Sequence, residues 1–405
     1  MKRRDFLRGL AATGSLAALA GCNRTGGDAA DLPGVGRADG CGAYEPTVEG
    51  TPGWHTVGGD PAGTGVAPAA AGPETPFSVD WTFPIDGVSG TTRPAVADGR
   101  AYTHDLNSTV YAVDTETGES VWQQGITEPR GSPAVGEAAV VVIAEDHVVG
   151  YDPATGEKRW SGPPGNPDLF SGSPVVADGT AFVPYGLSLY ALDLADGSIL
   201  WRHTTGEETV STPAVVGDTV FYGDDDTYVY ALDRASGEMR WRYKTETHIR
   251  CNVAVADGTA VTATIDGDVF GFDAATGDRR WAYSVGGEPA VVACDGANAY
   301  VGTRSRLYAL DPETGTPCWS TGEYAGSYDS GLTIADGKVY VTATVGRDDG
   351  TVPAVLDAAS GELRWKLDRG PDEDRLGFEH GPVVVDGAVY ATGGGANTLR
   401  LTRMS

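Results

Sequence analysis

The stretch Asp114-Thr-Glu-Thr-Gly118-Glu-Ser-Val-Trp122 decides how this chain folds, because its pattern D-x-x-x-G-x-x-x-W occurs seven times. The later copies are Asp152/Gly156/Trp160, Asp193/Gly197/Trp201, Asp233/Gly237/Trp241, Asp273/Gly277/Trp281, Asp311/Gly315/Trp319 and Asp357/Gly361/Trp365. Successive motif tryptophans are 38, 41, 40, 40, 38 and 46 residues apart. A period near 40 residues is the signature of a repeat protein, in which stacked units form one body.

One repeat reads as four short strands. Between residues 211 and 243, apolar runs at 212–216, 219–222, 228–232 and 239–243 are separated by polar turns. This spacing predicts a four-stranded antiparallel meander. Asp-Gly pairs, a strong hairpin signal, recur between the first two strands of the units. They stand at Asp98-Gly99, Asp178-Gly179, Asp257-Gly258, Asp295-Gly296, Asp336-Gly337 and Asp386-Gly387.

The nine-residue motif is interpreted as scaffold. Its Asp ends the third strand and can accept hydrogen bonds from backbone N–H groups of the turn. Its Gly supplies a positive φ angle, and its Trp enters the outer strand and covers the seam to the next unit. A small residue two before the Asp, such as Ala112 or Gly150, leaves room for an indole. The predicted docking residues are Trp81, Trp122, Trp160, Trp201, Trp241, Trp281, Trp319 and Trp365.

The number of units predicts how the body closes. After seven complete units, residues 382–402 supply three strands and then stop, while the stretch 77–83 around Trp81 supplies a fourth. Joining strands from the two ends of the chain in one unit closes a ring and hides its edges. The sequence therefore predicts an all-β fold, an eight-bladed β-propeller over residues 51–405.

The first 50 residues are expected to serve export and anchoring. Residues 1–21 resemble a twin-arginine signal peptide, with the basic stretch 2–8 followed by an apolar stretch over 9–20. Leu19-Ala20-Gly21-Cys22 resembles a lipobox, which would make Cys22 the lipidated N-terminus; a plain signal peptide cut nearby or an uncleaved anchor are the alternatives. Residues 22–50 are predicted to be a flexible tether, unless they form a short element pinned by Cys41.

Charge and cysteine content narrow the function. The formal net charge of -27 makes nucleic acid an unlikely partner, because its phosphates would be repelled. Such acidity resembles the proteins of halophilic archaea, with an ordinary acidic secreted protein as the alternative. No C-x-x-C pair is present, so no metal site is predicted. The pairing of Cys41, Cys251, Cys294 and Cys318 stays open, as does the oligomeric state, for which a monomer is expected.

The repeat resembles the tryptophan-docking motif of the pyrroloquinoline-quinone (PQQ) type β-propellers, as does the opening Trp54…Gly59-Asp60…Thr64-Gly65. The resemblance implies an eight-bladed propeller in one of two branches, the quinoprotein alcohol and sugar dehydrogenases or non-catalytic lipoproteins similar to BamB. The dehydrogenases hold PQQ, with calcium beside it, between a Trp and a disulfide of adjacent cysteines. This chain has no adjacent cysteines, and every Trp is assigned elsewhere, so no cofactor is predicted.

The candidate ligand site lies where the loops between blades would ring the mouth of the central channel. These loops carry Arg93, Arg130, Ser171, Ser211, His248, Arg250, Glu288, Tyr328, Asp329, Glu379 and His380. A partly basic funnel in an acidic shell would attract anionic ligands or acidic peptides. The alternative is that these charges form structural pairs, for instance Arg250 with Asp329. No catalytic residue is predicted. Calcium could bind at Asp224-Asp225-Asp226 or Asp266-Gly267-Asp268, but solvated carboxylates explain both stretches more simply.

The sequence thus favours a lipid-anchored, non-catalytic propeller that binds protein partners at the outer face of the cytoplasmic membrane. A PQQ-dependent oxidoreductase with an atypical site is the first alternative, and a solute-binding lipoprotein is the second. Fold alone does not decide between them.

Overall fold

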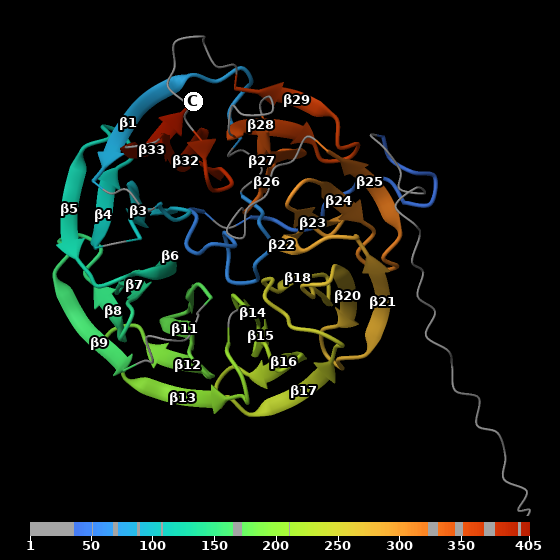
Figure 1. The fold of residues 1–405 in the computed structure, drawn as a ribbon, viewed down its shortest axis with the longest axis horizontal. Coiled ribbons are helices and arrows are strands. Elements are labelled where there is room, and N and C mark those ends of the chain that lie inside the picture. Colours follow the sequence, from blue (N-terminus) through green and yellow to red (C-terminus); the bar gives the residue numbers. More distant parts are fainter. Residues whose placement is uncertain are drawn as a thin grey trace, which may run out of the picture.

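The computed structural model is a ring of eight β-sheets arranged around a central axis (Figure 1). It describes residues 36–50, 52–67, 72–86, 90–106, 108–164, 172–209, 211–322, 331–344, 351–367, 377–395 and 398–405. Across these ranges all regular elements are strands. The predicted all-β, eight-bladed propeller is confirmed. The signal peptide, Cys22 and the stretch 22–35 lie outside the described residues.

Each of the first seven blades is an antiparallel meander whose strands follow one another in sequence, with the last strand at the rim (Figure 1). Blade 1 comprises β2 (Ala95–Ala97), β3 (Arg100–His104), β4 (Thr109–Asp114) and β5 (Ser120–Gly125), and blade 2 comprises β6 (Arg130–Val135), β7 (Val140–Ile143), β8 (His147–Tyr151) and β9 (Lys158–Pro164). Blade 3 comprises β10 (Val175–Ala177), β11 (Thr180–Tyr185), β12 (Ser188–Asp193) and β13 (Ile199–Thr204), and blade 4 comprises β14 (Ala214–Val216), β15 (Thr219–Gly223), β16 (Tyr228–Asp233) and β17 (Met239–Lys244).

Blades 5 to 8 complete the ring. Blade 5 comprises β18 (Ala254–Ala256), β19 (Thr259–Ala263), β20 (Asp268–Asp273) and β21 (Arg279–Ser284), and blade 6 comprises β22 (Pro289–Cys294), β23 (Ala299–Thr303), β24 (Leu307–Leu310) and β25 (Pro317–Thr321). Blade 7 comprises β26 (Thr333–Ala335), β27 (Lys338–Thr344), β28 (Thr351–Asp357) and β29 (Leu363–Lys366). Blade 8 comprises β30 (Gly377–Phe378), β31 (Val383–Val385), β32 (Ala388–Gly395) and β33 (Thr398–Met404) with β1 (Val79–Ile85).

Blade 8 contains both ends of the folded chain, as the unit count predicts. β1 pairs with β33 in antiparallel register, Phe83 opposite Leu401. The backbone N–H groups of Ser78 and Ser405 each donate to the other residue's carbonyl oxygen, at 3.0 and 3.1 Å. This pairing leaves no gap in the ring, because the N-terminal strand supplies the outer edge that the C-terminal strands lack.

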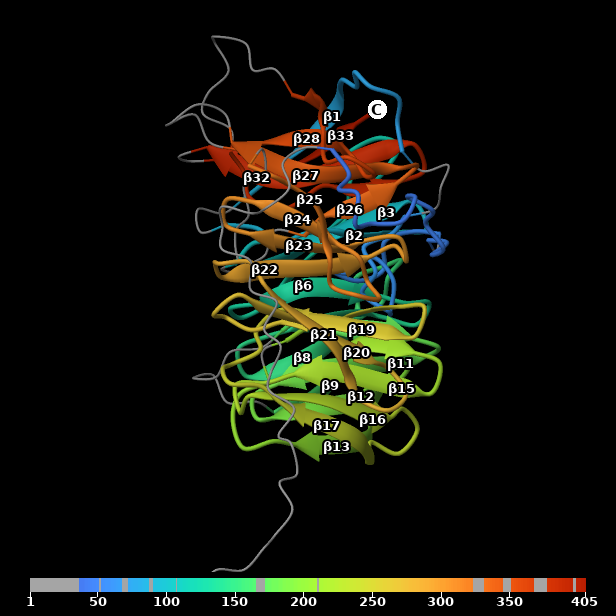
Figure 2. The same cartoon turned by 90° about the vertical axis from the view of Figure 1, so that its right-hand side faces the viewer.

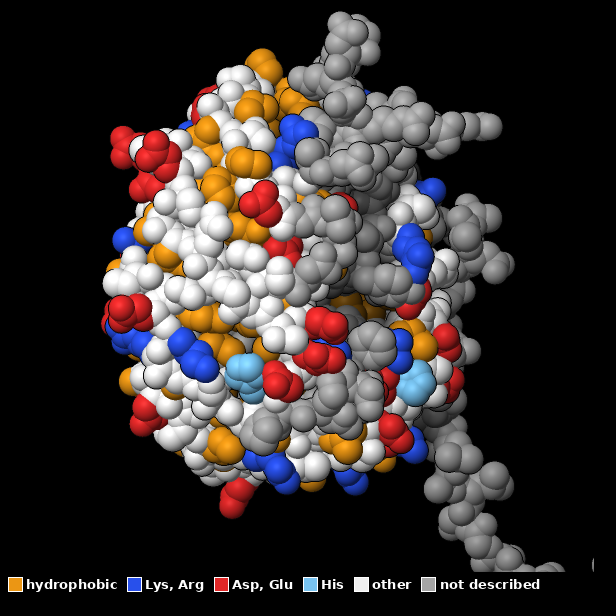
Figure 3. All heavy atoms as spheres, turned by 60° about the vertical axis from the view of Figure 1, so that its left-hand side comes forward, with side chains coloured by type: hydrophobic (Ala, Val, Ile, Leu, Met, Phe, Trp, Pro, Cys, Tyr) orange, Lys and Arg blue, Asp and Glu red, His pale blue; other side chains and the backbone are white. Residues whose placement is uncertain are grey.

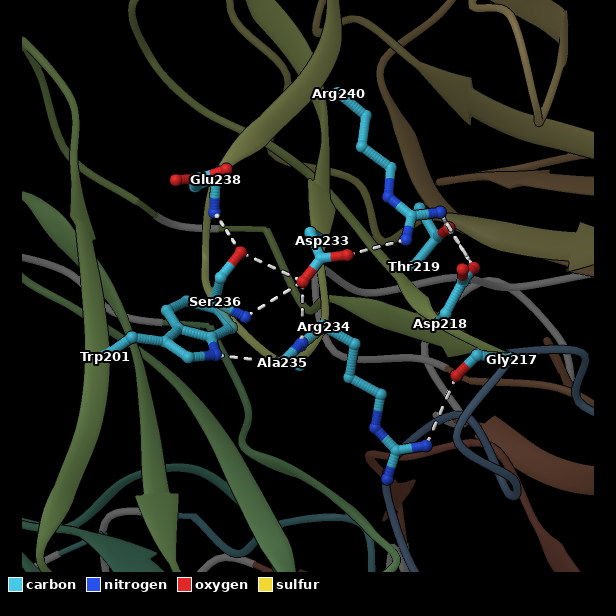
Figure 4. A network of polar contacts seen from close by, with 10 residues as sticks. All are labelled: Trp201, Gly217, Asp218, Thr219, Asp233, Arg234, Ala235, Ser236, Glu238 and Arg240. Atoms are coloured by element: carbon cyan, nitrogen blue, oxygen red, sulfur yellow. Dashed lines mark hydrogen bonds and ion pairs between the residues drawn. The ribbon is translucent and has the colours of Figure 1, made fainter.

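The docking motif folds as a closed polar turn, shown for blade 4 in Figure 4. Oδ1 of Asp233 accepts hydrogen bonds from the backbone N–H groups of Ala235 (3.1 Å) and Ser236 (2.9 Å) and from the Ser236 hydroxyl (2.9 Å). Oδ2 accepts from Arg240 at 2.7 Å. The side-chain hydrogen bond from Arg240 leads the causes that lower the pKa of Asp233 to about 2. The carboxylate therefore stays ionised and organises the turn.

The motif glycine is required both by its own positive φ angle and by the tryptophan ring that packs against it. Gly237 has φ of 71°, and a Cβ at this position would lie 2.6 Å from the Trp201 ring of the preceding blade. The Trp201 indole in turn donates to the Arg234 carbonyl oxygen at 2.7 Å (Figure 4). The same donation, at 2.7–3.1 Å, joins seven of the eight docking tryptophans to the next turn: Trp81, Trp122, Trp160, Trp201, Trp241, Trp281 and Trp319.

Trp365 is the eighth docking tryptophan, and its environment differs. The turn that it would meet is absent, because the chain ends and begins again in blade 8. Phe77 lies against it instead, with the ring centroids 3.9 Å apart. The seam between blades 7 and 8 is thus closed by an aromatic contact with the N-terminal end of β1.

The ring has two different faces, which we name by their connections. The turn face carries the hairpin turns between first and second strands and the docking turns between third and fourth strands. The loop face carries the connections between second and third strands and those between blades. All loops proposed from the sequence to surround the channel mouth belong to the loop face.

The segment 52–67, here called the plug, lies across the turn-face end of the channel. Its backbone bonds to the inner strands of six blades, through Val96, Val135, Val215, Val255, Cys294 and Ile334. Asp60 holds the plug's own turn, since its carboxylate accepts from the backbone N–H of Thr64 at 3.0 Å and from the Thr64 hydroxyl at 2.5 Å. In Figure 2 this early part of the chain, in blue, lies along the right-hand side of the disc.

The segment 36–50, here called the strap, leads from the rim to the plug over the turn face. A disulfide joins Cys41 to Cys318 on the outer strand β25. The Tyr44 hydroxyl donates to the Asp295 carboxylate at 2.8 Å, and the Gly36 N–H donates to the Ser360 carbonyl oxygen at 2.7 Å. Residues 36–50 therefore form the pinned element that was the alternative to a flexible tether, because a covalent bond and long-range contacts fix them.

Candidate functional site

Arg93, first in the predicted ring, is not available at the channel mouth. Its side chain is 1% exposed, and it donates to the carbonyl oxygens of Val57 (2.6 Å), Gly381 (3.1 Å) and Pro382 (3.0 Å) and to the Thr333 hydroxyl (2.9 Å). Its guanidinium carbon lies 4.6 Å from the centroid of the Trp54 ring. Arg93 is thus a structural anchor that ties the plug to blades 7 and 8.

Arg250 and His248 do reach the loop face, and both bind the same residue. Arg250 donates to both carboxylate oxygens of Asp225, at 3.1 and 2.7 Å, and its side chain is 50% exposed. Nδ1 of His248 lies 2.6 Å from the Asp225 carbonyl oxygen. The structural pair foreseen for Arg250 therefore exists, with Asp225 as the partner; Asp329 lies outside the described residues.

Some of the remaining predicted residues are buried in contacts within the fold, and others lie at the surface. Ser211 is fully buried and its hydroxyl accepts from the Gly223 N–H at 2.8 Å, while Glu288 pairs with Arg304 at 3.5 Å. His380 is buried, with Nε2 2.7 Å from the Thr91 carbonyl oxygen. Arg130 begins β6 and Glu379 is exposed. Ser171, Tyr328 and Asp329 lie outside the described residues.

Basic and acidic side chains therefore occur together around the channel mouth. Arg250, for example, is neutralised by the neighbouring Asp225 carboxylate. On the face seen in Figure 3, acidic and basic side chains are likewise interspersed. Arg250 is half exposed whereas Asp225 is 9% exposed, so the Arg250 guanidinium is the group of this pair that an incoming charged group can reach. In the described part of the chain no cluster of three His, Cys, Asp or Glu residues could hold a metal ion, and no helix could span a membrane.

A buried polar cluster at the seam of blades 3 and 4 was not found from the sequence. Asp224 is 0% exposed, and its Oδ1 accepts from the Tyr228 N–H at 3.1 Å while Oδ2 has no hydrogen-bond partner. Tyr222 and Tyr230 stack beside it with centroids 5.0 Å apart, and the Tyr222 hydroxyl lies 2.6 Å from Nδ1 of His203. Burial raises the pKa of Asp224 to about 6, aided by the nearby Asp226 carboxylate. From the sequence, the acidic run at 224–226 indicated only solvated loop carboxylates, because the burial of Asp224 depends on contacts that form in the folded protein.

Replacing Asp224 by Asn is expected to stabilise the protein above pH 6 but not below pH 4. The folded state favours the protonated carboxyl, so the wild-type chain loses stability as pH rises from the unfolded value near 3.8 to the folded value near 6. The gain at pH 8 is about 1–2 kcal/mol, because Asn removes the buried charge but must keep the hydrogen bond from the Tyr228 N–H with its amide oxygen. Denaturant unfolding at pH 8 and pH 4 measures it. Asp266→Asn, at an exposed loop carboxylate of blade 5, is the control, and an equal effect at both pH values for Asp224→Asn would contradict the assignment.

The described residues do not fit the PQQ arrangement that the resemblance implies. The disulfide joins Cys41 to Cys318 at the rim, and the two free cysteines, Cys251 and Cys294, are buried. Trp54 is 0% exposed, with the Arg93 guanidinium over one side of its ring. A Cβ on Gly59 would lie 2.8 Å from the same ring. No ring face of Trp54 is thus free to stack on a quinone.

Fold and docking turns together define a PQQ-type repeat propeller with tryptophan-docked blades. The chain belongs to the PQQ_2 family, described as outer membrane protein assembly factor BamB, whose model matches residues 49–213, 188–304 and 284–403. BamB of Yersinia pestis is 28% identical over 138 residues, which are 33% of this chain and 28% of that protein. The chain thus aligns with less than a third of the length of this curated relative.

Solved structures share the architecture. BamB from Moraxella catarrhalis superposes with a TM-score of 0.64 at 15% identity, covering 81% of this chain and 99% of that one. A quinohemoprotein alcohol dehydrogenase from Comamonas testosteroni gives 0.66 at 16% identity, covering 87% and 80%. Because a BamB and an alcohol dehydrogenase match about equally well at such low identity, these similarities establish the fold and leave function to the site.

Proposed function

We propose that this protein is an exported, lipid-anchored propeller that binds protein partners through its loop face without catalysing a reaction. The observation that carries the proposal is the use of every described tryptophan in scaffold, eight at seams and Trp54 under Arg93. The family's assembly-factor description favours a protein as the partner. Cys22 supplies the anchor at the outer face of the cytoplasmic membrane, and the chain acts as a monomer.

The loop face suits protein binding for a physical reason. Its connections differ from blade to blade, whereas the turn face repeats the same docking turn. Charged groups such as His248 and Arg250 lie partly exposed there and can exchange partners with an acidic segment. A repeat scaffold with variable loops on one face is the usual design of propeller binding surfaces.

Photo-crosslinking tests this proposal within a single blade. A crosslinker at Asp266, exposed on the loop face of blade 5, is expected to capture one defined membrane or surface protein at native salt. The same crosslinker at Ala275, exposed on the turn face of that blade, is expected to capture none. Equal capture from both positions would contradict the loop-face assignment. A Cys22→Ala variant is expected to leave the membrane fraction.

The alternatives predict different outcomes of one reconstitution. If the protein were a quinoprotein oxidoreductase, adding PQQ and calcium to the purified chain would shift the quinone absorption and yield dye-linked oxidation of alcohols or sugars. If it were a solute-binding lipoprotein, mass spectrometry of the native protein would find a bound small molecule. We expect neither, because Trp54 is covered and the described mouth cations are paired within the protein.

A further inference from the structure

The strap and plug fix where the N-terminal part of the chain leaves the propeller. From the plug, the chain runs outward over blades 5 and 6, where the backbone N–H groups of Thr47 and Val48 donate to the Asp295 carbonyl oxygen at 3.0 and 3.1 Å. It reaches the rim where Cys41 is bonded to Cys318, and the Ala38 N–H donates to the Cys318 carbonyl oxygen at 2.8 Å. Gly36 then contacts the docking turn of blade 7 through Ser360. The exit therefore lies on the turn face, at the rim of blades 6 and 7.

The strap is fixed to the propeller by a covalent bond and by specific side-chain hydrogen bonds. Besides the disulfide, the Tyr44 hydroxyl and the buried Tyr300 hydroxyl both donate to Oδ2 of Asp295, at 2.8 and 2.9 Å. Arg37 donates to the side-chain oxygen of Asn298 at 2.9 Å. The bonds from Tyr44 and Arg37 each link residues more than 250 positions apart and, together with the disulfide, hold the strap against blade 6.

The plug closes the same face that the strap crosses. Among the described residues, backbone bonds from the plug to six inner strands close the turn-face end of the channel.

We propose that the propeller is held with its turn face toward the membrane, so that the loop face points away from it to receive partners. This rests on the lipid anchor at Cys22 in the proposed function. Only thirteen residues lie between the anchor and the first strap residue, Gly36. Even fully extended, this length of chain reaches no more than about 50 Å, which limits how far the exit rim can lie from the membrane. Without the strap, the free length would extend to the plug and would place no such limit.

A matched pair of labels in blade 6 tests the orientation. Ser305 and Glu313 are exposed and flank the strand β24, one on the loop face and the other on the turn face. Each is replaced by Cys in the full chain and labelled with a fluorescent donor. Cys251 and Cys294 stay unlabelled, because both are buried, which raises the pKa of each thiol to about 12. The lipidated protein is reconstituted in vesicles that contain an acceptor lipid in the outer leaflet.

Energy transfer from the Glu313→Cys label is expected to exceed that from Ser305→Cys by roughly twofold or more, since an extended strand separates them along the ring axis. Adding Cys41→Ser and Cys318→Ser, which removes the disulfide, should bring the ratio toward one. Equal or reversed transfer in the parent chain would overturn the orientation. If the chain does not bind vesicles, or if Cys22 itself reacts with the label, the anchor of the proposed function fails and the orientation with it.

Discussion

Replacing Trp319 by Ala is expected to lower the free energy of unfolding by about 3–5 kcal/mol, among the largest losses for any single docking residue. Trp319 is 0% exposed, and its indole donates to the Ala358 carbonyl oxygen at 3.0 Å. A Cβ on Gly361 would lie 2.5 Å from its ring, which shows how closely the next blade packs. Truncation would leave a cavity between blades 6 and 7 that this rigid turn cannot fill. Denaturant unfolding at fixed salt measures the loss.

Two variants control this experiment. Trp319→Phe keeps most of the packing and loses the indole hydrogen bond, so its cost should be nearer 1 kcal/mol. Trp365→Ala removes a partly exposed indole that meets Phe77 instead of a docking turn, and a smaller loss than for Trp319→Ala is expected. If Trp365→Ala cost as much as Trp319→Ala, the docking turn would not be what makes the seam tight.

Replacing Arg93 by Met is expected to cost about 3–5 kcal/mol and to release the plug. The substitution keeps an unbranched apolar stem but leaves the carbonyl oxygens of Val57, Gly381 and Pro382 without this donor. Each buried carbonyl that loses its donor costs about 1–3 kcal/mol. Unfolding free energy gives the total, and limited proteolysis gives the specific readout, because cleavage between residues 57 and 62 should appear.

Arg250→Met is the matched control for Arg93. Its guanidinium is half exposed and bonds to one carboxylate, that of the 9% exposed Asp225, so its removal should cost less than that of Arg93, about 1–2 kcal/mol. It should also leave the plug resistant to protease. Protection of residues 57–62 in Arg93→Met would show that the backbone bonds alone hold the plug.

Arg93 and Arg250 show why the residues around the channel mouth could be proposed from the sequence, but not sorted into buried and exposed ones. Arg93 stands two residues before the inner strand β2 and Arg250 four residues before β18, and this spacing does not show which of the two is buried. Arg93 turns inward because the carbonyls of Gly381 and Pro382, 288 and 289 residues away, form a pocket beneath it. Arg250 stays outside because Asp225 of the preceding blade meets it at the surface.

The sequence by itself determined the blade count, the turn chemistry and the closure of the ring. These follow from local rules, an Asp that binds its own turn and a Gly at positive φ, repeated at a fixed period. Only the tertiary structure decided which loop charges are buried, that one carboxylate oxygen of Asp224 has no hydrogen-bond partner, and that Cys41 pins the strap to Cys318. Those features depend on contacts between blades, and no local pattern encodes which distant residues will meet across a closed ring.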